Sequence, residues 1–189
     1  MLSRLQQTET AMADAFNTYR FDLAAQTIYE FVWNEYCDWY VELAKVQLNR
    51  GDEASQRATR RVLVRVLEVI LRLLHPIMPF ITEELWQTVA PLANAKHTDS
   101  IMIATWPVAD ASKIKPDSLD KMAVLQDLMG AVRNLRGEMN LGPAVKAPLL
   151  IEGGAELDIY LPYLPMMARL SEVKRVDVLP EDDAPVVMA

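Results

Sequence analysis

Few side chains in this sequence have the type and spacing that catalysis or metal binding requires. Cys37 is the only cysteine, and the only two histidines, His75 and His97, lie far apart in the sequence. These three residues do not have the short spacing in sequence that is typical of metal ligands. The sequence contains no P-loop, no G-x-G-x-x-G segment and no nucleophile elbow, and no cationic residue adjoins Cys37 to activate its thiol. We therefore expect no catalytic residue and no metal site.

A first group of candidate binding residues is a set of arginines on one side of a predicted helix. Arg57, Arg61, Arg65 and Arg72 share this side with Glu68. Glu68 and Arg72 stand four residues apart, which favours an ion pair on a solvated helix face. The alternative is a track of positive charge that binds phosphates.

A second group lies near the end of another predicted helix. Arg133, Arg136 and Asn140 project from one flank of this helix, beside its apolar face. In one interpretation the arginine stems cover the edge of the core while the charged ends stay in water. In the other, the guanidinium groups contact the backbone or the phosphates of a partner.

A third group stands out because apolar residues occur on a polar helix side. Val41 shares an arc of the helix with Asn34, Asp38 and Lys45, and Phe31 lies further round. An apolar platform between hydrogen-bonding side chains and a lysine is what an unstacked nucleic-acid base needs. Phe31 is an equal candidate for docking against another domain.

Hydrophobic periodicity predicts the elements that hold these residues: a mainly α-helical bundle with a small C-terminal β-α-β appendage. We expect the helical bundle over residues 1–143 and the α+β appendage over 144–189. Asp22 is expected to cap the second helix, and Pro79 to begin the fourth. The predicted helices cover residues 1–17, 23–47, 53–75, 79–89 and 118–140, and the predicted strands cover 145–152 and 173–180.

One segment, Tyr29 to Glu42, concentrates six aromatic side chains in a chain that is only 7% aromatic. At the α-helical period these rings fall on one broad side of the second helix, which predicts a core seam against other helices. The residues assigned to this buried side are Ala25, Ile28, Tyr29, Val32, Trp33, Tyr36, Trp39, Tyr40 and Leu43.

Composition restricts the class of protein further. The chain has 189 residues, of which 51% are hydrophobic, enough for a sizeable core. Its most hydrophobic run, residues 62–81, is interrupted by Arg65, Glu68, Arg72 and His75, so we expect no membrane span. The first residues lack a signal-peptide pattern, and we expect a monomeric cytoplasmic protein. Because the net charge is −7, a nucleic-acid partner would need a local basic surface.

Three segments resemble the anticodon-binding domain of bacterial valyl-tRNA synthetases, which are class I aminoacyl-tRNA synthetases. They are "YRFDLAAQTIYEFVWNEYCDWYVELAK", "LLHPIMPFITEELWQ" and "AVRNLRGEMN", and the resemblance spans about residues 16–179. The "NEYCDWY" segment is typical of the valine enzymes rather than of the isoleucine enzymes, which are the alternative. The resemblance implies a helical bundle that recognises the anticodon of valine tRNA and follows the catalytic domain of a longer ligase.

The resemblance also implies roles for particular residues. Val41 would contact an anticodon base, and Asn34, Asp38 and Lys45 would supply polar contacts. Arg133 and Arg136 would serve the tRNA backbone or the fold itself.

The class I signature motifs are absent from this sequence, so the fragment is expected to bind tRNA without aminoacylating it. ATP and magnesium would act in the parent enzyme, and no cofactor is expected here. The expected partners are valine tRNA and the catalytic domain of the same chain. The alternative is an interaction module with negligible tRNA affinity, in which Phe31 packs on that catalytic domain.

Overall fold

The computed structural model describes residues 1–176, and these form two compact units, Met1–Pro116 and the residues from Asp117 onward. Compact units need not coincide with domains, so the domain boundary predicted between residues 143 and 144 stays a prediction. No helix among the described residues is long and apolar enough to cross a membrane.

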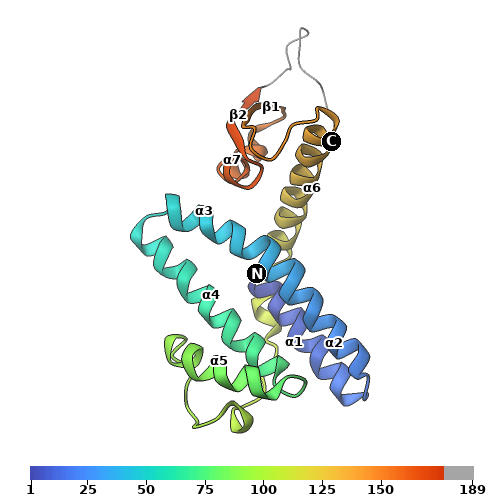
Figure 1. Ribbon diagram of the computed structural model, residues 1–189, viewed down its shortest axis with the longest axis vertical. Helices are drawn as coiled ribbons and strands as arrows, with labels where there is room; N and C mark the ends of the chain where they lie inside the picture. The colour runs from blue at the N-terminus through green and yellow to red at the C-terminus, as the bar shows by residue number, and fades with distance from the viewer. Residues whose placement is uncertain (177–189) are drawn as a thin grey trace. The chain divides into compact units, whose positions relative to one another are not determined.

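The first unit is built from helices (Figure 1). One long helix runs without a break through α2 (Phe21–Glu30), the π-helical segment η1 (Phe31–Val41) and α3 (Glu42–Arg50), because the backbone stays right-handed helical at both junctions. The helices predicted from the sequence in this unit are confirmed. The other helices of the unit are α1 (Leu2–Asn17), α4 (Glu53–Leu74) and α5 (Pro79–Leu92).

Local sequence explains where these helices begin. The carboxylate of Asp52 accepts a hydrogen bond of 2.8 Å from the backbone N–H of Ser55, and so caps α4. Pro79 occupies the first turn of α5, where no backbone N–H is needed. The cap predicted at Asp22 is wrong: Arg20 precedes the helix, and Asp22 lies within its first turn. The Arg20 guanidinium, 2.7 Å away, lowers the pKa of the Asp22 carboxyl to about 2.

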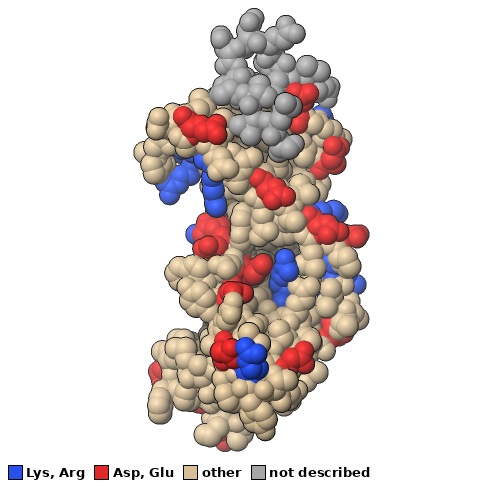
Figure 2. Space-filling view, turned by 90° about the vertical axis from the view of Figure 1, so that its right-hand side faces the viewer, with Lys and Arg blue, Asp and Glu red and all other residues tan. Residues whose placement is uncertain are grey.

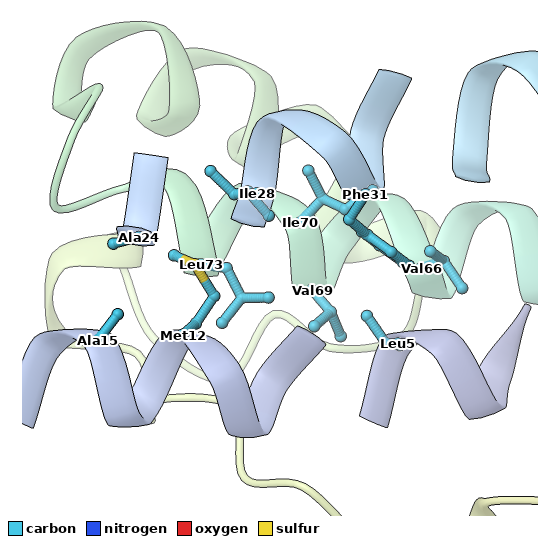
Figure 3. Packing of buried hydrophobic residues seen from close by; sticks show 10 residues of the cluster. All are labelled: Leu5, Met12, Ala15, Ala24, Ile28, Phe31, Val66, Val69, Ile70 and Leu73. Carbon is cyan, nitrogen blue, oxygen red and sulfur yellow. The ribbon is translucent and has the colours of Figure 1, made fainter. Parts of the chain in front are cut away.

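Three helices of the first unit meet in one apolar core (Figure 3). Ala24, Ile28 and Phe31 follow one another at helical spacing and face the core from the long helix. From α1 the core receives Leu5, Met12 and Ala15, and from α4 it receives Val66, Val69, Ile70 and Leu73.

The predicted buried aromatic side of the long helix is therefore partly wrong. Tyr29 and Trp33 are 63% and 56% exposed, whereas Phe31, predicted to lie on the outer side, is only 3% exposed. The buried side is narrower than predicted, because α1 and α4 contact the side marked by Ile28 and Phe31. From Phe31 the winding is π-helical, with more residues in each turn, so an α-helical period places the later residues only approximately.

The second unit contains the predicted β-α-β appendage. Strands β1 (Ala147–Glu152) and β2 (Leu170–Val176) pair in parallel, with Leu149 opposite Val173, and the short helix α7 (Leu164–Met167) lies in the connection between them. The unit also holds α6 (Pro116–Glu138). The second strand begins three residues before its predicted start, and predicted strand positions 177–180 lie outside the described residues. The fold is mainly helical with a small parallel sheet, as the sequence predicted.

Candidate nucleic-acid interface

The first predicted group of contact residues lies along the long helix. Asn34 and Asp38 are both exposed, four residues apart, in the π-helical segment η1, and Lys45 is exposed on α3. Val41, at the end of η1, is only half-buried, so part of its side chain faces solvent. The helix therefore presents an amide, a carboxylate, a partly exposed aliphatic group and an ammonium group along its length.

Asn34 also borders a shallow groove between α1 and the long helix. This groove has a volume of about 300 Å³, and Arg4 and Gln7 line its α1 side while Thr27, Glu30 and Asn34 line the other. Arg4 lies 3.5 Å from the carboxylate of Glu35, so its charge is partly balanced within the groove. The groove is thus lined by both polar and apolar groups, and Asn34 is one of its hydrogen-bonding side chains.

The electrostatic surroundings of these residues are mixed rather than basic. Lys45 forms an ion pair with Glu42, one turn before it, and both side chains are substantially exposed. On the face shown in Figure 2, acidic and basic side chains gather in small separate groups, and no continuous basic tract crosses its described residues. An interface here would depend more on hydrogen bonds and stacking than on the field of many cations.

Two aromatic residues that the helical period predicts to be buried, Tyr29 and Trp33, lie at the surface of the same helix. Tyr29 and Trp33 have nearly parallel rings, with an interplanar angle of 2° and centroids 6.4 Å apart. Their spacing of four residues was the available signal, because residues at i and i+4 are neighbours on a helix. The α-helical period and the size of the rings both favour a core seam, so the sequence pattern does not distinguish this surface pair from buried rings.

The arginines predicted on α4 do not form one continuous exposed row. Arg57, Arg61 and Arg65 are exposed, and Arg57 forms an ion pair of 2.9 Å with Glu53. Arg72 instead points inward, with only 15% of its side chain exposed. A phosphate-binding track that includes Arg72 is therefore excluded.

The predicted pair of Glu68 and Arg72 is confirmed, but it lies in the interior rather than on a solvated face. Arg72 donates two hydrogen bonds to the Glu68 carboxylate, of 2.7 and 2.9 Å, and a third, of 2.7 Å, to the carbonyl of Thr105. Glu68, which is 1% exposed, also accepts a hydrogen bond of 3.0 Å from the indole N–H of Trp86. The network joins α4 to α5 and to the segment that follows, so its role is structural.

The two arginines predicted on α6 differ in their surroundings. Both border a hollow of about 340 Å³ in the second unit. The guanidinium of Arg136 donates to the carbonyls of Gly142 and Val145, at 3.0 and 2.8 Å, and thereby fixes the chain that leads from α6 to β1. Arg133 is exposed. These contacts favour a role in the fold for Arg136, and the exposure of Arg133 is compatible with a partner contact.

The described residues offer no arrangement for a metal centre. Among residues 1–176, no three His, Cys, Asp or Glu side chains come together in a group that could hold a metal ion. The thiol of Cys37 is exposed on the π-helical segment. The arrangement of residues is therefore one of hydrogen-bonding and stacking groups on a rigid helix.

Comparison with known proteins identifies the family. The family model described as the anticodon-binding domain of tRNA ligase matches residues 1–151. The chain is 66% identical, over its whole length, to a valine–tRNA ligase of Laribacter hongkongensis. It is 65% and 61% identical to those of Chromobacterium violaceum and Neisseria meningitidis serogroup B.

The chain spans about 20% of the length of each of these relatives. The family model covers the whole of the first unit and continues through α6 into β1 of the second. The chain therefore belongs to the family of anticodon-binding domains of tRNA ligases, and it corresponds to this domain of a valine–tRNA ligase.

Proposed function

We propose that this chain reads the anticodon region of valine tRNA, as one part of a longer, ATP-dependent valine–tRNA ligase. The observation that carries the proposal is that Asn34 and Asp38 are both exposed, four residues apart on one helix, in a chain that belongs to this family. Amide and carboxylate side chains can hydrogen-bond to the edges of unstacked bases, which is how proteins read single-stranded RNA.

The other predicted residues take complementary roles. The exposed part of Val41 supplies an apolar contact to a base, and Lys45 reaches a phosphate once its ion pair with Glu42 opens. Arg133 contacts the tRNA backbone, whereas Arg136 holds the fold of the second unit. ATP and its magnesium ion serve the activation of valine elsewhere in the longer chain, and no residue of this domain takes part in that step.

A second candidate function is that of an interaction module with little affinity for tRNA. The net charge of −7 and the exposed aromatic pair favour it. The residue that the sequence suggested for docking, Phe31, is only 3% exposed and packs in the core, so docking through Phe31 is excluded.

Binding measurements with two tRNAs separate these functions. The chain is titrated with valine tRNA and with the same tRNA carrying a changed anticodon, at about 50 and 200 mM salt. A preference of tenfold or more for the cognate anticodon, about 1.4 kcal/mol, supports base reading by this domain. Equal binding that vanishes at the higher salt concentration would refute it, because phosphate contacts alone carry no sequence information.

A further inference from the structure

The exposed aromatic pair is part of a longer apolar row on the long helix. Ala25, Tyr29, Trp33 and Cys37 follow one another at every fourth residue through α2 and η1, and all four are exposed. The rings of Tyr29 and Trp33 stack on each other. A step of four residues is close to one full turn in both the α-helical and the π-helical winding, so the four side chains form a single row. Covering a Tyr or a Trp ring buries about 150–250 Å² of surface, so the row offers a substantial apolar contact area.

The row is bordered by acidic and amide groups. Gln26 follows Ala25 and Glu30 follows Tyr29 in the sequence, and the two side chains hydrogen-bond to each other at 2.8 Å. Between residues 21 and 44 the sequence has five carboxylates and no Lys or Arg, and three of the carboxylates, Asp22, Glu35 and Glu42, pair with cations outside this range. Glu30, beside Tyr29, hydrogen-bonds to an amide instead. The row itself therefore offers no cation to a phosphate backbone, whose binding depends on neutralisation by cations. An apolar protein segment flanked by basic residues fits the row better.

The length of the relatives indicates where such a segment comes from. The chain covers about 20% of each valine–tRNA ligase to which it is similar, so about four-fifths of such a ligase lies outside it. We propose that the row of Ala25, Tyr29, Trp33 and Cys37 is an intramolecular docking surface for an amphipathic segment of the rest of the ligase. Basic residues at the edge of that segment pair with Glu30.

The inference rests on the part of the proposed function that places this chain in a longer ligase, and it is independent of anticodon reading. A docked segment covers the rings whether or not tRNA is bound. A base that stacks on them covers them only when tRNA is present. The two cases therefore differ in one observable, the accessibility of the row in the tRNA-free ligase.

Thiol labelling of the full-length ligase that carries this sequence measures this accessibility. Ala25→Cys places a thiol in the row, and Ala58→Cys is the matched control, because Ala58 is an equally small exposed residue on another helix, α4. The rate of maleimide labelling of each thiol, and of the native Cys37, is followed by peptide mass spectrometry without tRNA. The same variants labelled in urea give the intrinsic rates.

Docking predicts that the thiol of Ala25→Cys and Cys37 react at least tenfold more slowly than the thiol of Ala58→Cys. Adding Trp33→Lys to Ala25→Cys should remove this protection, because a charged side chain replaces the central ring of the row. Equal labelling of the row and the control would overturn the proposal. Protection that arises only after tRNA is added would also overturn it, in favour of base stacking. Loss of tRNA discrimination alone would leave these rates unchanged.

Discussion

The ion pair of Glu68 and Arg72 provides the sharpest prediction, because sequence and structure assign it different energies. As a solvated helix pair it would contribute about 0.3–0.5 kcal/mol. In the structure the Glu68 side chain is 1% exposed, that of Arg72 is 15% exposed, and the carboxylate also accepts from Trp86. Replacing one partner of this network therefore leaves a charge in the interior without its counter-charge.

The expected magnitudes follow from these contacts. Glu68→Leu removes the acceptor of three hydrogen bonds and should cost about 3–5 kcal/mol of unfolding free energy. Arg72→Met should cost a similar amount, because it isolates a buried carboxylate. In the double variant both charges are absent, and only Trp86 and the carbonyl of Thr105 lose a partner, at about 1–3 kcal/mol each. The double variant should therefore be less destabilised than the sum of the two single variants by 2 kcal/mol or more.

Urea and thermal unfolding, followed by circular dichroism, measure these free energies in the four proteins of the cycle. A single substitution should lower Tm by about 6–20 °C. Losses below about 1 kcal/mol in both single variants would refute the reasoning, because the pair would then behave as a solvated surface pair. Additive losses would also refute it, since residues of one buried network are expected to couple.

Three further predictions concern separate residues. Glu9 is 5% exposed, and its burial raises the pKa of its carboxyl above the usual 4.5. The folded chain therefore holds this proton to a higher pH than the unfolded chain does. The protein loses stability as the pH rises from the unfolded-state pKa through the folded-state pKa. Glu9→Gln should therefore raise Tm at pH 7 and have no such effect at about pH 4, as a pH series of thermal unfolding would check. Lys45→Ala should weaken all tRNAs alike and reduce the salt dependence of binding, whereas Asn34→Ala should weaken mainly the cognate anticodon; equal losses for both tRNAs in both variants would contradict these roles. Arg136→Ala should cost about 1–3 kcal/mol of stability, through lost hydrogen bonds to Gly142 and Val145, with an unchanged salt dependence of tRNA binding.

Local patterns along the sequence suffice to predict most helices and strands of this protein, and its family. Helix periodicity, Pro79 and the strand predicted over residues 145–152 are local signals, and each is confirmed, with the strand observed over Ala147–Glu152. The segment around Cys37 resembles the valine enzymes, and this resemblance depends on residue identity alone, not on tertiary contacts. The exposure of Asn34, Asp38 and Lys45 also agreed with the predicted polar side of the helix.

Which sides of the helices are covered depends on contacts between the helices. Tyr29 and Trp33 lie at the surface and Phe31 lies in the core because α1 and α4 contact the long helix over a narrow side. The winding of η1 then shifts the later positions, and no local signal in the sequence marked this change. In the same way Arg72 enters the interior because α5 brings Trp86 to Glu68. Burial depends on contacts between segments that are distant in the sequence, and the periodicity of a single helix does not predict those contacts.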